Sequence, residues 1–139
     1  MIWHTNVKFK GIDAKDQWHY GDLLHIQGRP YIVESFDPRE IKMTEVRWVR
    51  QFAGVKDFYE TEVYFGDYIQ NLEDDTEPCW EVENKVEPEF YNLLLMDRKS
   101  FKKNGYCWHL IDTSAIEARY KVIGNSISTP HIWKNMIED

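Results

Sequence analysis

The distribution of apolar residues in the first third of the chain predicts short β-strands separated by tight turns. The apolar residues Leu23, Leu24 and Ile26 lead into a Gln-Gly-Arg-Pro run at 27–30, and residues 31–33 resume the apolar pattern. Two short apolar runs joined by residues of this kind indicate a β-hairpin. Residues 43–52 then alternate between polar and apolar side chains, which predicts one half-buried strand.

The dipeptide Gly-Asp is repeated within the chain, at Gly21-Asp22 and again 45 residues later at Gly66-Asp67. At both places an aromatic residue precedes the dipeptide, and a short apolar strand, a turn and a strand ending in Val-Glu follow it. Glycine tolerates backbone conformations that other residues resist, and aspartate accepts hydrogen bonds from nearby backbone N–H groups. We therefore predict two β-hairpins, each entered through a Gly-Asp bend.

The second half of the chain predicts further strands after an acidic loop. The first half of the acidic stretch 73–89 has the composition of a solvated loop. The apolar run 93–96 has a length that fits a strand or a short helix. An Asn-Gly turn signal at 104–105 favours a strand, with 106–111 as its partner. Residues 115–123 predict another strand, or a short turn followed by a strand.

The last ten residues have the pattern of a short helix. Thr129 suits an N-cap, and Pro130 suits the first helical position. Ile132, Trp133 and Met136 would share one apolar face of this helix. We interpret that face as a possible interaction surface, packed on the rest of the chain or on a partner.

Composition is consistent with a packed, mainly β fold. The chain has 139 residues, enough to bury a core without disulfides or metal, and 15% of the residues are aromatic. We expect a single domain over residues 1–139. Within it, possible subdomains cover residues 1–60, as an N-terminal β unit, and 61–139, as a small barrel with the C-terminal helix.

Charge and targeting signals narrow the possible partners and compartment. The formal net charge of −7 opposes binding to nucleic acid, unless cations gather on one face, and opposes docking on anionic lipid. The N-terminus lacks the apolar core of a signal peptide, and no apolar run is long enough to span a bilayer. These features predict a cytoplasmic protein in which Cys79 and Cys107 are free thiols.

The sequence contains no catalytic motif, phosphate-binding loop or metal signature. Asp22 and Asp67 would form a carboxylate pair only if the two bends met in space, so we interpret both as bend residues. A zinc site at Cys107 and His109 would need two further ligands, so we expect neither a metal nor a cofactor. Both cysteines are expected to be inert, because the acidic residues around Cys79 raise the pKa of its thiol.

Two groups of cations are candidates for nucleic-acid binding. One interleaves Arg47 and Arg50 with Trp48, which is the pattern of a single-strand platform. The alternative for both groups is ordinary surface solubility. The second and more basic group lies in an expected loop and consists of Arg98, Lys99, Lys102 and Lys103.

Three segments of the chain resemble the YopX-like family of phage and prophage proteins. Residues 9–24 are similar to the family pattern F-R-G-K followed by E-W-V-Y-G-D-L-I, and residues 120–130 to its ending Y-E-V-I-G-N. Residues 51–69 are similar to Q-F-T-G-L-K-D-K-N-G-K-E-I-Y-E-G-D-I-V without a gap. The matching positions in this middle segment are Gly54, Lys56, Asp57, Glu62, Tyr64, Gly66 and Asp67.

This resemblance implies an SH3-type small β-barrel and a phage or prophage origin, and it implies no reaction. The chain departs from the family at residues 58–60, where Phe-Tyr-Glu replaces the Asn-Gly turn. We expect a non-enzymatic accessory protein of the bacterial host cytoplasm. It would act by binding a host or phage protein or a second copy of itself, and the alternative is a nucleic-acid-binding module that uses residues 98–103.

Overall fold

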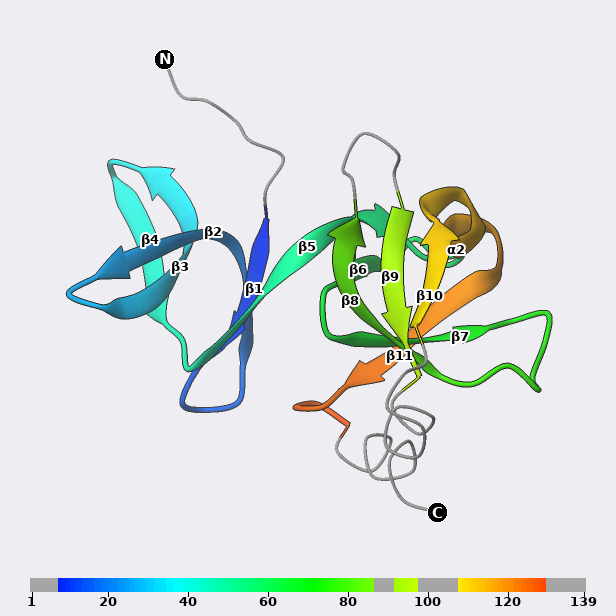
Figure 1. The fold of residues 1–139 in the computed structure, drawn as a ribbon. Coiled ribbons are helices and arrows are strands. Elements are labelled where there is room, and N and C mark those ends of the chain that lie inside the picture. Colours follow the sequence, from blue (N-terminus) through cyan, green and yellow to red (C-terminus); the bar gives the residue numbers. More distant parts are fainter. Residues whose placement is uncertain (1–7, 87–91, 98–107, 130–139) are drawn as a thin grey trace. The chain divides into compact units, whose positions relative to one another are not determined.

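The computed structural model describes residues 8–86, 92–97 and 108–129 of the chain (Figure 1). The chain divides into two compact units, the first ending at Gly54 and the second beginning at Val55. The boundary between the two subdomains expected from the sequence was between residues 60 and 61. Each unit is described by itself below.

The first unit is an antiparallel sheet with the strand order β4-β3-β2-β1-β5. Its strands are β1 (Phe9–Ile12), β2 (Trp18–Ile26), β3 (Arg29–Asp37), β4 (Glu40–Glu45) and β5 (Trp48–Lys56), whose end belongs to the second unit. Strands β2 and β3 form the hairpin predicted from residues 23–33, with Leu23 opposite Ile32. The turn residues Gln27 and Gly28 have φ values of 52° and 79°, as a two-residue hairpin turn requires.

The prediction of one strand over residues 43–52 is wrong, because the chain turns between β4 and β5. Val46 lies between the two strands and is only 3% exposed. Its backbone N–H donates to the Pro30 carbonyl, and that of Arg47 donates to the Ile12 carbonyl. A Cβ atom added to Gly11 would lie within 2.9 Å of the Val46 side chain, so a glycine makes room for this residue. The burial of Val46 between the strands thus interrupts the strand predicted from the alternation of residues 43–52.

The second unit contains a five-stranded antiparallel sheet and one short helix. The strand order is β10-β9-β8-β7-β11, and β6 is hydrogen-bonded to the end of β5. The elements are β6 (Glu62–Tyr64), β7 (Asp67–Asn71), β8 (Trp80–Val86), β9 (Asn92–Met96), β10 (Trp108–Asp112), α2 (Thr113–Arg119) and β11 (Tyr120–Asn125). The strand predicted at residues 93–96 is confirmed as β9, and it pairs with β10 as expected.

The strand proposed over residues 115–123 is wrong in its first half, which is helix α2. The Asp112 side chain caps this helix by accepting a hydrogen bond from the Ser114 backbone N–H at 2.8 Å. Ile116, on the inner side of the helix, is fully buried. The alternative of a turn followed by a strand is closer to the observed structure, since β11 begins at Tyr120.

The mainly β class is therefore confirmed, with two antiparallel sheets. Neither sheet closes into a barrel within the described part of the chain, since each strand order begins and ends with different strands. The expected SH3-type barrel is thus not confirmed. The predicted C-terminal helix and the Asn-Gly turn lie outside the described residues.

One loop structure occurs in both units. Asp13 donates its backbone N–H to the Gln17 carbonyl at 2.9 Å and accepts the Gln17 N–H on its carboxylate at 3.0 Å. Asp57 makes the same two bonds with Thr61, both at 2.8 Å. In each loop the residue before the closing position has a positive φ, 63° in one and 65° in the other. The similarity between the two segments that contain Gly-Asp therefore also includes the loop before each dipeptide, which an aspartate closes.

Candidate functional site

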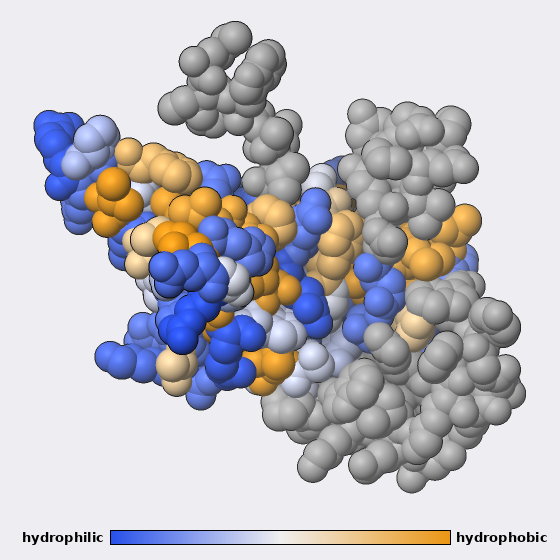
Figure 2. All heavy atoms as spheres, turned by 60° about the vertical axis from the view of Figure 1, so that its left-hand side comes forward, coloured by the Kyte–Doolittle hydropathy of each residue, from blue (hydrophilic) through white to orange (hydrophobic). Residues whose placement is uncertain are grey.

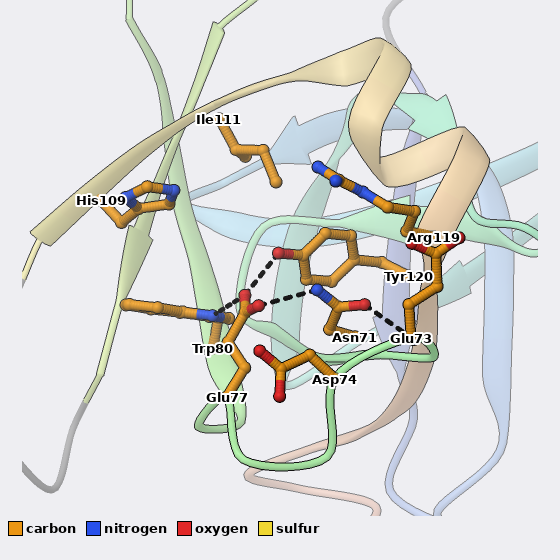
Figure 3. Close-up of a pocket in the computed structure, with 9 residues that line it drawn as sticks. All are labelled: Asn71, Glu73, Asp74, Glu77, Trp80, His109, Ile111, Arg119 and Tyr120. Carbon is orange, nitrogen blue, oxygen red and sulfur yellow. Dashed lines mark hydrogen bonds between the residues drawn. The ribbon is translucent and has the colours of Figure 1, made fainter.

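A pocket of about 480 Å³ lies in the second unit, beside the loop that joins β7 to β8 (Figure 3). We call it the β7–β8 pocket. Residues from the end of β7, the loop, the start of β8, strand β10 and the α2–β11 junction line it. These are Asn71, Glu73, Asp74, Glu77, Trp80, His109, Ile111, Arg119 and Tyr120.

The Glu77 carboxylate is the centre of the hydrogen bonding in this pocket (Figure 3). Its Oε1 accepts a hydrogen bond from the Trp80 indole N–H at 2.7 Å and another from the Tyr120 hydroxyl. Its Oε2 accepts one from the Asn71 amide at 2.7 Å. The side-chain oxygen Oδ1 of Asn71 in turn accepts the Glu73 backbone N–H at 2.9 Å. One carboxylate therefore ties the loop to β7, β8 and β11.

This arrangement favours an ionised Glu77. Partial burial raises the pKa of the carboxyl, but the hydrogen bonds from Tyr120, Asn71 and Trp80 outweigh burial, so the pKa lies below its ordinary value. Burial raises the pKa of Tyr120 well above its ordinary value, and the bond to Glu77 adds to this. Glu77 thus remains charged near neutral pH, and Tyr120 remains a hydrogen-bond donor.

Two aromatic rings form one wall of the pocket. The rings of Trp80 and His109 are stacked, with centroids 5.4 Å apart and planes inclined by 27°. Arg119 lines the pocket from the end of α2, and Glu73 and Asp74 line it from the loop. Three carboxylates against one guanidinium leave the pocket with an excess of negative charge.

The two Gly-Asp dipeptides have different environments. Asp67 is 1% exposed and accepts the Tyr64 backbone N–H at 2.8 Å, across the β6–β7 turn that contains Gly66. Asp22 is exposed in the middle of β2, and no hydrogen bond to its carboxylate is found among the described residues. The two aspartates belong to different units.

Gly21 and Gly66 nevertheless lie against equivalent positions of the second strand of their hairpins, β3 and β8. A Cβ atom added to Gly21 would be 2.2 Å from the Val33 carbonyl oxygen, and the Gly66 N–H donates to the Val82 carbonyl at 2.6 Å. Val33 and Val82 are the valines of the repeated Val-Glu pair. The two hairpins therefore share a close approach between glycine and valine backbones.

Several candidate residues lie outside the described part of the chain. These are Arg98, Lys99, Lys102, Lys103, Cys107, Ile132, Trp133 and Met136. Cys79 is half-buried, and burial together with the charge of Asp97 raises the pKa of its thiol. A raised pKa is the direction expected from the sequence. Burial is the larger cause of the shift, and the negative charge of Asp97 is the smaller one. Within the described ranges no three His, Cys, Asp or Glu side chains form a metal-binding group.

Sequence reasoning missed Glu77 and its partners. It placed Glu77 among the acids of a solvated loop, and it did not indicate that Trp80 stacks on His109. The spacing of Glu77 and Trp80 is a weak local signal for their hydrogen bond. Tyr120 lies 43 residues from Glu77, and nothing in the sequence pairs the two.

Comparison of the chain with models of protein families and with curated proteins gives no match. Membership of the YopX-like family therefore stays a prediction. Among the described helices, none has the length and apolar character needed to cross a membrane.

Proposed function

We propose that this chain is a non-enzymatic binding protein whose β7–β8 pocket receives a basic side chain of a partner protein. The observation that carries this proposal is the pairing of an acidic rim with the stacked Trp80 and His109 rings. A cation gains from carboxylates and from the face of an aromatic ring at the same time. Arginine and lysine side chains combine a cation with an apolar stem that suits such a wall.

Binding rather than catalysis agrees with the state of Glu77. A general acid or base needs a pKa near the working pH and a free oxygen for the proton. The Glu77 pKa is instead held low, and both oxygens already accept hydrogen bonds. Its role in the proposal is to hold Trp80 and the loop in place.

The same proposal includes an SH3-type fold for the second unit and a phage-derived accessory role in the host cytoplasm. The strand order is its support: β7 to β10 form a meander, a short helix follows, and β11 returns beside β7. The similarity to the YopX-like pattern covers residues 51–69, and residues 55–69 of this segment belong to the same unit.

A titration of the ¹⁵N-labelled protein with a short peptide tests the pocket. The probe is acetyl-Gly-Arg-Gly-amide, and acetyl-Gly-Gln-Gly-amide is its neutral counterpart. We expect the arginine peptide to shift the indole N–H signal of Trp80 and the side-chain amide of Asn71. The neutral peptide should leave both signals in place.

Matched variants locate the binding. Asp74→Asn keeps the oxygen that accepts from Thr76 but removes the charge, and with Glu73→Gln it should abolish the shifts. Asp75→Asn removes a neighbouring exposed charge that does not line the pocket and should preserve them. Equal losses in both variants, or no shift with the arginine peptide, would contradict the proposal.

Self-association is a second candidate, supported by an apolar face of the first unit. Strand registers place Val33 opposite Met43 and Phe36 opposite Ile41, so these residues share one face of β3 and β4. Hydrophobic residues reach the surface of this unit in Figure 2. Those at least 38% exposed on β2, β3 and β4, apart from Tyr20, are Leu24, Ile26, Phe36, Ile41 and Met43.

Sedimentation velocity over a range of concentrations tests self-association. Ile41→Lys should convert a concentration-dependent dimer into a monomer, whereas Tyr59→Lys, at an equally exposed site in the second unit, should not. A wild-type protein that sediments as a monomer at all concentrations would rule this candidate out.

A further inference from the structure

The β7–β8 pocket contains a positive charge that the binding of a basic side chain does not use. Arg119 lines the pocket from the end of α2, it is exposed, and no ion pair or hydrogen bond of its guanidinium is found among the described residues. Its backbone is fixed beside the loop, because the Arg119 carbonyl accepts the Leu72 N–H at 2.7 Å. A guanidinium presents five N–H donors, and a carboxylate can accept two of them at once.

Asp74 supplies an opposite charge on the loop side of the pocket. It is exposed, and its Oδ1 accepts hydrogen bonds from the Thr76 hydroxyl and from the Thr76 backbone N–H. These bonds hold the pKa of Asp74 below its ordinary value, so the carboxylate is charged at neutral pH. An exposed and ionised carboxylate held in this way can pair with a cation of a ligand.

The two charges lie on either side of the hydrogen bond between Tyr120 and Glu77. In Figure 3 the Arg119 guanidinium lies on the Ile111 side of the Tyr120 ring, and the Asp74 carboxylate lies beside Glu77. Burial and Glu77 raise the pKa of Tyr120, whereas the positive charge of Arg119 lowers it. Burial and the negative charge of Asp74 both raise the pKa of Glu77, against the hydrogen bonds that lower it. The pocket is therefore positive at its α2 end and negative at its loop end.

A ligand that satisfies both ends carries a cation and an anion a short distance apart. An arginine or lysine at the C-terminus of a protein does so, because its side chain and its α-carboxylate belong to one residue. In an extended chain the next side chain points to the opposite side, so an acidic residue directly after an internal arginine would leave the pocket. The pocket volume of about 480 Å³ lies within the range of about 300–1,000 Å³ that is typical of small-ligand sites.

We propose that the β7–β8 pocket binds the C-terminal residue of a partner protein that ends in arginine or lysine. This inference rests on the proposed function, in which the basic side chain occupies the acidic part of the pocket beside Trp80 and His109. The α-carboxylate accepts hydrogen bonds from the Arg119 guanidinium. The lining residues that carry these contacts at the rim are exposed, namely Glu73, Asp74, His109 and Arg119.

Two peptides that differ only in the terminal carboxylate test this on the ¹⁵N-labelled protein. Acetyl-Gly-Arg with a free carboxylate should bind about fivefold more tightly than acetyl-Gly-Arg-amide, as followed by the indole N–H signal of Trp80. Overall charge predicts the opposite order, because the amide brings more positive charge to an acidic pocket. The Nε–H signal of Arg119 should shift with the free acid and stay in place with the amide.

Matched variants assign the preference to one guanidinium. Arg119→Gln should abolish the preference for the free acid, while its continued binding of the amide peptide verifies that the variant is folded. Lys121→Gln removes a cation of β11 that does not line the pocket and should keep the preference. If both variants reduce the preference equally, the attraction is non-specific and the proposal fails.

The results separate this inference from the proposed function. If the amide binds as tightly as the free acid or more tightly, the pocket receives a basic side chain but does not recognise a chain end. If neither arginine peptide binds, the proposed function fails as well.

Two further peptides test whether both charges must belong to the terminal residue. Acetyl-Gly-Gln with a free carboxylate should not bind measurably, because it lacks the cation. Acetyl-Gly-Arg-Gly-Glu-Gly-amide should bind no more tightly than acetyl-Gly-Arg-amide. Binding of the glutamine acid as tight as that of the arginine acid would overturn the proposal, as would an equal gain from the internal glutamate.

Discussion

Glu77 shows how one side chain can organise a loop. Three donors reach it, from the Trp80 indole, the Asn71 amide and the Tyr120 hydroxyl. Hydrogen bonds to an ionised acceptor are stronger than those between neutral groups, and a donor left without its partner in a half-buried site is costly. The structure of the β7–β8 loop therefore depends on this charge.

Replacing Glu77 with Gln should lower the free energy of unfolding by about 1–3 kcal/mol at neutral pH. The amide nitrogen of Gln would face the donor amide of Asn71, and the charge that strengthens the other bonds would be lost. Because the Glu77 pKa is lowered on folding, its stabilisation is present above the ordinary value of 4.5 and disappears as pH falls through the lowered pKa.

Urea unfolding at neutral and acidic pH measures both effects. Glu73→Gln, an exposed lining residue, is the control and should be nearly neutral. A Glu77→Gln protein as stable as the wild type at neutral pH would show that the hydrogen bonds do not stabilise the loop.

His19 gives the first unit a different dependence on pH. Its Nε2 lies 2.8 Å from Asp13 Oδ2 and its Nδ1 lies 2.8 Å from Glu34 Oε1, while Lys42 contacts the other Glu34 oxygen at 3.0 Å. The hydrogen bond to Asp13, followed by that to Glu34, raises the His19 pKa above 6.5 despite its partial burial. An imidazolium can donate to both carboxylates, whereas neutral imidazole donates only once.

The stabilising effect of His19 should therefore be complete below pH 6.5 and should be lost as pH rises through the raised pKa. In a His19→Gln protein, the stability of the first unit should no longer fall as pH rises through this range. Hydrogen exchange of β1–β3 amides, corrected for intrinsic rates, measures this stability. His25→Gln, at an exposed histidine of β2, is the control and should keep the wild-type profile.

At the scale of elements, the two Gly-Asp hairpins depend on close backbone packing. Gly21 has the Val33 carbonyl oxygen where a Cβ atom would stand, and backbone cannot move aside as a flexible side chain can. Gly28, in the β2–β3 turn, has a positive φ of 79° but open space around it. The two glycines of one hairpin are thus needed for different reasons.

Gly21→Ala should destabilise the first unit by more than about 3 kcal/mol, because β2 and β3 must separate locally. Gly28→Ala should cost only about 1–2 kcal/mol, the strain of a left-handed alanine. Thermal unfolding of both variants measures the difference. Equal losses would show that backbone conformation, and not the contact with Val33, requires Gly21.

At the scale of the whole molecule, each unit has its own buried residues. Ile32 is fully buried in the first unit, and Ile116 is fully buried in the second. Truncating a buried isoleucine to alanine costs about 2–5 kcal/mol, and the loss falls first on the cooperative unit that contains it.

Ile32→Ala should therefore accelerate hydrogen exchange mainly in β1–β4, and Ile116→Ala mainly in β7–β11. Mass spectrometry of peptides from the exchanged protein measures both patterns. If either variant lowers protection equally over both sets of strands, the chain opens as one unit.

The sequence by itself determined the features that depend on neighbours along the chain. Short apolar runs next to turn residues identify the β2–β3 hairpin and strand β9, because tight turns accept few residue types. The repeated Gly-Asp dipeptide also predicted the two hairpins β2–β3 and β7–β8, because it is followed in both places by a short strand, a turn and a second strand. The aspartate-closed loops at Asp13 and Asp57 were overlooked, although their local spacing was present in the sequence.

Only the tertiary structure decided which distant residues meet. Burial of Val46 broke a predicted strand, and packing of Ile116 made a helix where the pattern suggested a strand. Glu77 joins Tyr120 across 43 residues, and Trp48 meets Trp18 through the register of three strands. Periodicity describes which way a side chain points from its own strand, whereas a site requires the pairing of strands, which long-range packing selects.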